Sequence, residues 1–257
     1  MPVPCPAAPA GKRKNQSEFE RQAIEAGASV GLGRVATTDG GSRGKQAKSV
    51  RTRRGRGGPT RPAFNRRKME TGLRMFLRGL GPVVSRRDLR ETPRLVTRAF
   101  SDELLAGYLQ DGHPLLEPLL DAPPEALVVV RGVRFVSVCR HHLLPFQGSA
   151  SVAYLPDSRM AGFSSVARLV DTLARRLQLQ EELSEQILDR LEESLAPRGS
   201  ACLLEATHQC MTCRGARQRD SRVATLRLRG IFTKDRGLRR EVVSLLQAPP
   251  GAGWEAR

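Results

Sequence analysis

LVVVRGVRFVSV, residues 127–138, and SASVAYL, residues 149–155, decide the fold class because the first is rich in β-branched residues and the second has the alternating pattern of a strand. Gly132 lies in the middle of the first stretch, which predicts either two strands or one bent strand. The second stretch alternates small polar and apolar residues and predicts a further strand that ends at Pro156 and Asp157. A pair of adjacent antiparallel strands is therefore expected.

After these strands the apolar residues recur at helical spacing. Two successive stripes predict two helices, and they consist of Val166, Leu169, Val170, Leu173 and Leu177, then Leu183, Ile187, Leu188, Leu191 and Leu195. Residues 201–206 and 223–232 predict two more strands, and residues 238–246 predict a terminal helix. This order predicts an α+β domain, an antiparallel sheet with two helices packed on one face.

A helical segment is expected before the sheet. Its first helix begins near Lys68 and ends at Gly81, and a second covers residues 92–108 with Pro93 in its first turn. Residues 111–125 contain four prolines and predict a connection. We therefore divide the chain into a basic tail (1–67), a helical preface with its linker (68–125) and a strand-rich domain (126–248).

The charge of the chain is concentrated in the tail. The 257 residues carry a formal charge of +17, and residues 1–67 alone hold 15 Lys or Arg against four Asp or Glu. This segment is rich in Gly, Arg, Ser and Thr and cannot bury enough apolar surface to offset its ordering entropy. We expect a disordered tail, or a misassigned translation start, in preference to a nucleic-acid-binding arm.

The cysteine count and the absence of long apolar runs bear on location. Five cysteines follow a start, MPVPCPAAPAGKRK, that lacks the apolar region of a secretory signal. No apolar run approaches the roughly 20 residues that cross a bilayer. We expect a cytoplasmic protein without membrane segments, whose reduced thiols are free to bind metal.

The densest group of metal-binding residue types is CRHH at 139–142, followed about 70 residues later by HQCMTC at 208–213. Thiolates and imidazoles are the ligands that zinc (Zn2+) prefers. One interpretation is a closed structural site that uses four of these residues, including Cys213. The other is an open site with three ligands and a position for water, and the adjacent His141 and His208 favour it because hydrolysis needs acid and base groups.

Four segments, CRHHLLPF, GFSSVAR, RRLQLQEEL and EATHQCMTCRG, resemble in this order the signature segments of the GTP cyclohydrolase I family. The resemblance extends over residues 89–246 and includes Thr92 and Pro93. It implies the tunnelling fold (T-fold) and zinc-dependent hydrolysis of GTP at C8, with release of formate and rearrangement to 7,8-dihydroneopterin triphosphate, the first step of pterin and folate synthesis. It also implies a homo-oligomeric ring, usually a decamer, with active sites between chains.

The resemblance places the zinc ligands at Cys139, His142 and Cys210. Cys213 then falls outside the ligand set, and we expect it to be a free buried thiol. The resemblance also places catalytic histidines at His141 and His208, which would deliver protons to the guanine imidazole ring and to the opening ribose.

Substrate-binding positions follow from the same resemblance. Glu181 matches the carboxylate that accepts hydrogen bonds from guanine N1 and the exocyclic amine, with Gln180 and the backbone near Leu179 beside it. Three further positions match residues that contact the ribose or the triphosphate: Ser164, Arg168 and Arg214.

The chain departs from the family pattern at the phosphates and beside the metal. Ser165 replaces a phosphate-binding lysine, Leu95 replaces an arginine, and Arg140 replaces the usual acidic residue after the first ligand cysteine. Three hypotheses follow: an ordinary enzyme in which Arg94 and Arg140 replace the missing cations, a divergent paralog that serves specialised pterin or 7-deazapurine metabolism, or an inactive protein that binds zinc and purine.

Overall fold

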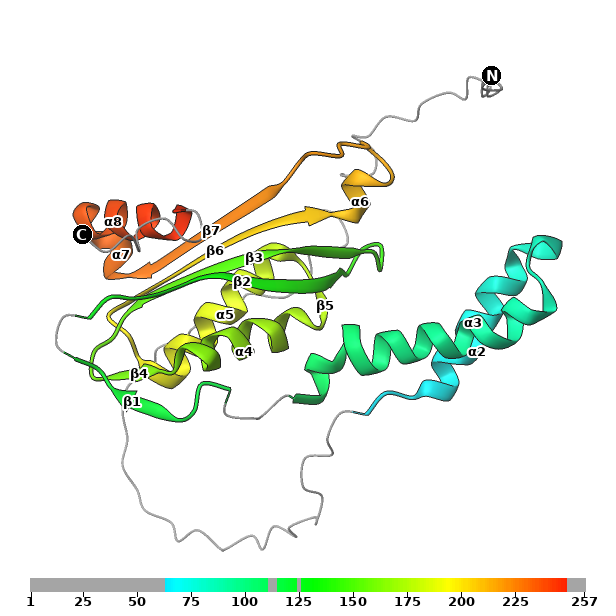
Figure 1. Ribbon diagram of the computed structural model, residues 1–257, viewed down its shortest axis with the longest axis horizontal. Helices are drawn as coiled ribbons and strands as arrows, with labels where there is room; N and C mark the ends of the chain where they lie inside the picture. Colours follow the sequence, from blue (N-terminus) through cyan, green and yellow to red (C-terminus); the bar gives the residue numbers. More distant parts are fainter. Residues whose placement is uncertain (1–62, 111–114, 124–125, 249–257) are drawn as a thin grey trace, which may run out of the picture. The chain divides into compact units, whose positions relative to one another are not determined.

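The computed structural model describes residues 63–110, 115–123 and 126–248, and the expectations for residues 1–62 lie outside this range. Its centre is a five-stranded sheet in the order β5-β2-β3-β6-β7 (Figure 1). The long strands β2 (Val128–Cys139), β3 (Pro145–Leu155), β6 (Gly199–His208) and β7 (Val223–Gly230) are antiparallel to their neighbours. Only the two-residue β5 (Leu177–Gln178) runs parallel, beside the end of β2.

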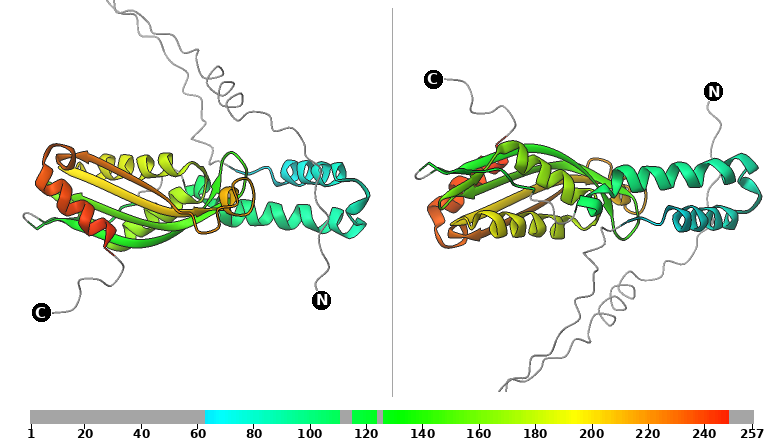
Figure 2. Two further views of the ribbon diagram at one scale, coloured as in Figure 1. Left: turned by 90° about the horizontal axis from the view of Figure 1, so that it is seen from above. Right: turned by 90° about the horizontal axis from the view of Figure 1, so that it is seen from below.

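Helices α4 (Phe163–Ala174) and α5 (Gln180–Leu195) cover one face of this sheet, as Figure 2 shows from two sides. Alternate residues of the strands point at them, so the main core joins both helices to β2, β3 and β6. Tyr154, Leu169 and Leu188 are fully buried there. The predicted α+β architecture, with two helices on one face, is confirmed.

The opposite face of the sheet is covered at one end by α7 (Ile231–Lys234) and α8 (Arg236–Gln247). Ala153 and Leu203 point to this side and pack with Phe232 and Val242. The prediction that a strand continues to residue 232 is wrong, because the strand ends at Gly230. At φ 61° a side chain at this position would lie 2.4 Å from the carbonyl oxygen of Arg198, so only glycine allows the turn into α7.

Strand β2 is one bent strand rather than two. Its pairing with β3 shifts between Val130 and Val133, where Gly132 has a φ of 68°. This bulge bends β2 without ending it. The continuous strand carries the chain from the core to Cys139, the first residue of the candidate site.

Two helices precede the sheet, α2 (Arg66–Gly79) and α3 (Arg86–Ala99), with a short 3-10 turn between them (Gly81–Val83). Helix α3 begins six residues before the predicted start because Ser85 and Asp88 form a capping box, and Pro93 therefore lies inside the helix. A π-turn, η2 (Phe100–Leu104), and a 3-10 turn, η3 (Ala106–Gln110), follow. Among the described residues no helix combines the length and apolarity needed to cross a membrane.

The connection after η3 contains a strand that the sequence did not predict. Strand β1 (Leu119–Asp121) pairs with β4 (Arg159–Ala161), the short strand that leads into α4. This small sheet fixes the beginning of α4, so it also fixes the positions of Ser164 and Arg168.

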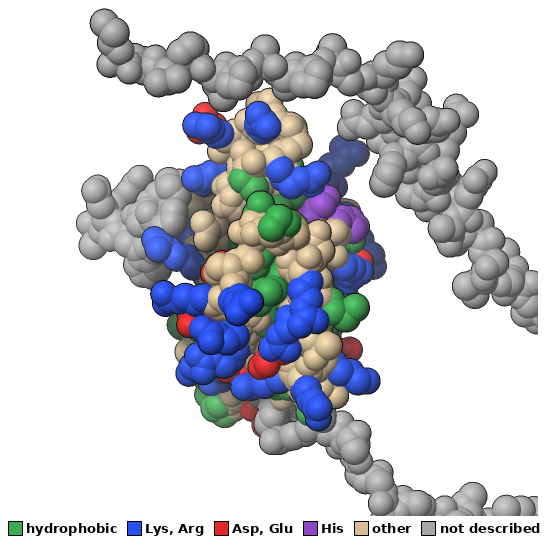
Figure 3. Space-filling model, turned by 90° about the vertical axis from the view of Figure 1, so that its right-hand side faces the viewer, with side chains coloured by type: hydrophobic (Ala, Val, Ile, Leu, Met, Phe, Trp, Pro, Cys, Tyr) green, Lys and Arg blue, Asp and Glu red, His purple; other side chains and the backbone are tan. Residues whose placement is uncertain are grey.

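The pair formed by α2 and α3 is both basic and apolar on its surface. Residues 68–99 hold eight Lys or Arg against three Asp or Glu, so they account for +5 of the net charge of +6 that residues 68–257 carry. Figure 3 shows the predominance of basic side chains on this side of the molecule. Met75, Phe76, Val83 and Leu95 are each more than half exposed. Such a surface is typical of an interface with another chain.

Candidate active site

The three predicted metal ligands come from two places that β2, β3 and β6 bring together. Cys139 is the last residue of β2, His142 lies in the turn between β2 and β3, and Cys210 lies in the short helix α6 (Gln209–Thr212) after β6. The turn is closed by hydrogen bonds between Cys139 and residues 143 and 144, with N···O distances of 2.9 and 2.8 Å. Leu143 adopts a φ of 54° in this turn.

The ligand atoms of Cys139, His142 and Cys210 all lie within 4.8 Å of one another. The Sγ of Cys139 is 3.9 Å from Nδ1 of His142. Ligand atoms around a tetrahedral zinc ion are about 3.5–3.8 Å apart, as its usual bond lengths of roughly 2.0–2.3 Å require. Small side-chain movements would therefore bring the three atoms to a zinc ion.

The electrostatics of this group also favour a cation. Burial and the neighbouring thiol of Cys139 raise the pKa of Cys210, and nearby Arg214 lowers it only slightly. Ionising both thiols side by side is unfavourable without a positive ion between them. Two sulfurs and one imidazole are a donor set that zinc binds well, so the residues present fit the predicted metal.

Cys213 does not belong to the group. Its thiol donates a hydrogen bond to the carbonyl oxygen of Gln209, with an S···O distance of 2.8 Å, and the residue is exposed. The expectation that Cys213 is a free thiol outside the ligand set agrees with this position. The expectation that it is buried is wrong, because α6 ends at Thr212 and the following loop leaves the core.

His208, one residue before α6, is held by Gln180 from the start of α5. The Nε2 of His208 lies 2.8 Å from the Oε1 of Gln180. The amide nitrogen of Gln180 lies within hydrogen-bond distance of three acceptors, the carbonyl oxygens of Leu204 and Val223 and the hydroxyl of Thr225, which share its two hydrogens, so its oxygen must face the histidine. His208 therefore carries a proton on Nε2 and leaves Nδ1 as an acceptor.

Burial lowers the pKa of His208, while the negative charge of Glu181 opposes this shift. The ring also stacks on Phe146, with centroids 4.5 Å apart and planes 4° from parallel. Phe146 and His208 are paired residues of β3 and β6, which explains the stacking. Phe146 is the last residue of the CRHHLLPF segment, but the sequence analysis assigned it no role in the site.

His141 and Glu181 are both exposed beside this group. The ring of His141 meets that of His142 edge to face, with centroids 6.1 Å apart. Glu181 lies in the first turn of α5, next to the N-cap residue Leu179. The side-chain amide of Gln180 is buried, and its hydrogen bonds are made within the protein. It therefore offers no free donor to a substrate, and the predicted substrate contact of Gln180 stays a prediction.

Ser164 and Arg168 lie near the other end of α4 from the metal group. Helix α4 begins beside β4 and ends at β5, which pairs with Cys139. From Ser164 to the end of α4 the helix extends about 15 Å. Arg168 donates to the Oγ of Ser165 at 2.9 Å and to the carbonyl oxygen of Glu117 at 3.4 Å.

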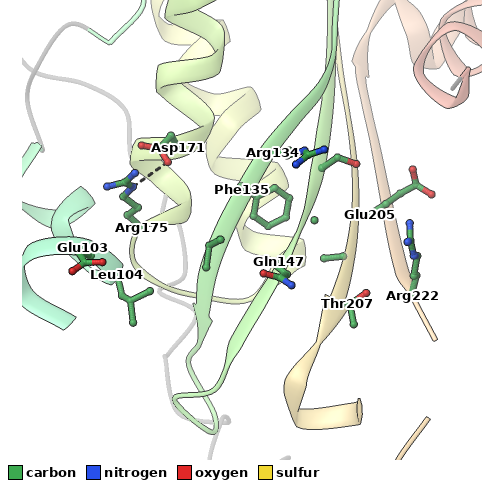
Figure 4. A pocket seen from close by; sticks show the side chains of 14 residues that line it. Glu103, Leu104, Arg134, Phe135, Gln147, Asp171, Arg175, Glu205, Thr207 and Arg222 are labelled. Carbon is green, nitrogen blue, oxygen red and sulfur yellow. Dashed lines mark hydrogen bonds and ion pairs between the residues drawn. The ribbon is translucent and has the colours of Figure 1, made fainter. Parts of the chain in front are cut away.

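A hollow of about 790 Å³ lies beside β2, β3 and β6 (Figure 4). Its polar lining includes Arg134, Gln147, Glu205 and Thr207, and the ion pair between Asp171 of α4 and the C-cap residue Arg175 borders it. None of the three metal ligands lines it. This hollow is thus distinct from the group of metal ligands.

Comparison with known proteins decides the family. The family model described as GTP cyclohydrolase I matches residues 69–247, well over half of the chain. The chain belongs to the GTP cyclohydrolase I family. The predicted resemblance is confirmed, and it includes α2 and α3 as well as the sheet.

Individual members of the GTP cyclohydrolase I family are similar over almost their whole length. A GTP cyclohydrolase 1 of Streptococcus agalactiae is 40% identical over 184 residues, which are 71% of this chain and 98% of the relative. A GTP cyclohydrolase 1 of Lysinibacillus sphaericus is 39% identical over 181 residues, 70% of this chain and 95% of the relative. A solved structure of the archaeosine synthase QueF-Like in the apo form matches 42% of this chain with 20% identity and a TM-score of 0.36.

Proposed function

We propose that the protein is a GTP cyclohydrolase I that hydrolyses GTP at C8, releases formate and forms 7,8-dihydroneopterin triphosphate. The observation that carries this proposal is the group of Cys139, His142 and Cys210 within reach of one ion, in a chain of this family. His208 and Glu181 lie beside the group and supply proton transfer and purine recognition. The catalytic domain is then residues 126–248.

Cys139, His142 and Cys210 would hold a zinc ion. When bound, zinc supplies a Lewis acid that makes water a nucleophile near neutral pH. His208 keeps Nδ1 free of a proton because Gln180 binds its Nε2–H, so His208 acts as a base. His141, exposed in the same turn as His142, is placed to deliver a proton to the guanine ring.

Glu181 would read the base. Guanine presents two donors, N1–H and the exocyclic amine, on one edge, and a carboxylate accepts both. The beginning of α5 gives Glu181 an exposed position beside His208. A purine that lacks the amine would leave one carboxylate oxygen without its partner.

The triphosphate would be held less firmly than the family pattern implies. Arg140 is bound by Glu182, with the two N···O distances at 2.9 and 2.5 Å, so it is not free to replace a missing phosphate cation. Ser165 is buried and Arg168 bonds to it. This favours, as a second candidate, a divergent paralog that acts on GTP with a weaker preference for the triphosphate.

We also propose that the protein is a homo-oligomer, a decamer in the family's usual form, located in the cytoplasm. Ser164 and Arg168 would then face the metal group of a neighbouring chain, since Ser164 lies about 15 Å along α4 from the helix end nearest its own metal group. Mixing two inactive variants, Cys210→Ser and Arg168→Ala, tests this arrangement. Shared sites restore part of the activity in mixed oligomers, whereas sites within single chains leave the mixture inactive.

The direct test is incubation of the zinc-loaded protein with GTP, followed by mass identification of the pterin product and by formate measurement. Formation of dihydroneopterin triphosphate with stoichiometric formate supports the proposal. Stoichiometric zinc without any product would identify an inactive binding protein instead. Comparing GTP, GDP and guanosine separates the ordinary enzyme, which strongly prefers GTP, from the divergent paralog.

A further inference from the structure

The residue between the first ligand cysteine and His141 is Arg140, and its side chain leaves the turn toward α5. Its guanidinium makes two hydrogen bonds to the two carboxylate oxygens of Glu182, at 2.9 and 2.5 Å. Two parallel hydrogen bonds between a planar guanidinium and a planar carboxylate fix the relative orientation of the two groups as well as the distance between them. Both side chains are somewhat less than half exposed.

Two backbone contacts support the same connection. The amide of Arg140 donates to the carbonyl oxygen of Gln178 at 3.1 Å, and Cys139 pairs with Gln178 in the sheet. Beyond this point β5 ends and α5 begins, so backbone pairing does not extend to residues 180–182. The ion pair of Arg140 and Glu182 continues the connection where the strands no longer provide it.

The two segments that this pair joins carry opposite halves of the site. The turn bears Cys139, His141 and His142, while the start of α5 bears Gln180, which holds His208, and Glu181. Each member of the pair is adjacent in sequence to one of these residues. A change in the Arg140 contact would therefore move the metal turn relative to the carboxylate that reads the base.

We infer that Arg140 and Glu182 are positioning residues that hold the metal-binding turn in register with the purine-reading start of α5. This inference rests on the proposed function. It assigns Arg140 a structural contact within the chain, so Arg140 is not a phosphate-binding residue. The reversed charge beside the metal is then matched by a carboxylate from α5.

The test is a set of four variants assayed for GTP turnover in the zinc-loaded full chain. Arg140→Glu and Glu182→Arg each lower kcat/KM by about tenfold, since small displacements of reacting groups cost this much or more. The exchanged double variant, Arg140→Glu with Glu182→Arg, restores kcat/KM to within about threefold of the original. The double alanine variant keeps the net charge without the contact, and its kcat/KM stays low.

Matched controls separate positioning from stability. Arg190 and Glu193 form an exposed pair on α5 at the end away from the metal, and reversing Arg190 should leave kcat/KM unchanged. Thermal unfolding of every variant should shift by less than about 4 °C, because exposed pairs add little stability. The inference is overturned if the exchanged variant stays as slow as the single reversals, or if the double alanine variant is fully active.

A second readout keeps this test independent of the GTP reaction. Cobalt bound in place of zinc reports the geometry of the ligands through its absorption spectrum. The single reversals should alter this spectrum or weaken cobalt binding, and the exchanged variant should recover both. If the original protein has no activity on GTP, the proposed function fails, while the cobalt series still decides whether the pair positions the turn.

Discussion

Gln180 offers the sharpest test of how the site is built, because the resemblance and the structure imply different roles for it. The family pattern places it beside the substrate, whereas its side chain is 2% exposed and binds His208 and two backbone carbonyls. Gln180→Leu removes the amide and keeps a similar volume. It therefore tests the hydrogen bonds without opening a large cavity.

The expected magnitude follows from the groups that lose partners. The carbonyl oxygens of Leu204 and Val223 each lose a donor at about 3 Å in a buried setting. A buried polar group that loses its partner costs about 1–3 kcal/mol. Both carbonyl oxygens keep some of their other hydrogen bonds, so we expect Gln180→Leu to lower the unfolding free energy by about 2–4 kcal/mol. Chemical unfolding at fixed protein concentration measures this loss.

The effect on turnover separates the two roles. If Gln180 holds His208, Gln180→Leu lowers kcat by about 10–100-fold and leaves KM nearly unchanged, because proton transfer depends on the orientation of the ring. Combining it with His208→Ala should then cause no further loss, since both changes remove the same function. A raised KM with unchanged kcat would refute this reasoning and restore the substrate contact.

Three further predictions concern the metal, the thiols and a charged network. Cys210→Ser should lose both zinc and turnover, whereas His141→Ala should keep zinc by metal analysis and lose turnover; zinc retained by the first variant would contradict the ligand assignment. Alkylation mapped by mass spectrometry should modify Cys213 in the folded protein and spare Cys202, because burial raises the pKa of Cys202 to about 12 and removes access; equal labelling would refute this. Arg229 binds three carboxylates of α5, so Arg229→Met should lower the unfolding free energy by about 1–2 kcal/mol at low salt and by less at high salt, as denaturation in both buffers would show.

The sequence predicted correctly those parts of the fold and the site in which burial or metal binding restricts the residue types that a position can hold. A β-branched run predicted β2, alternation predicted β3, and apolar stripes predicted α4 and α5, because burial on one face imposes such periods. The thiols and imidazoles of CRHH and HQCMTC predicted a metal site without any fold, because these residue types bind zinc wherever they lie. Residue chemistry left three or four ligands open, and the family resemblance then selected Cys139, His142 and Cys210.

The parts that the sequence missed depend on partners distant in the chain. The early start of α3 needs the paired caps Ser85 and Asp88, and the end of β7 needs the carbonyl of Arg198 against Gly230. Neither pair stands out from composition. The exposure of Cys213 likewise depends on where α6 ends, and a helix of four residues is too short to have a sequence pattern that predicts its end.

The run of Gln180, Glu181 and Glu182 shows why motif and geometry are both needed. Successive residues of a helix point about 100° apart, so three neighbours cannot share one partner. Gln180 points inward to His208, Glu182 reaches Arg140, and Glu181 is left exposed between them. The sequence shows two adjacent carboxylates that are chemically equal. The ion pair of Glu182 distinguishes them and leaves Glu181 as the carboxylate available for the proposed purine contact.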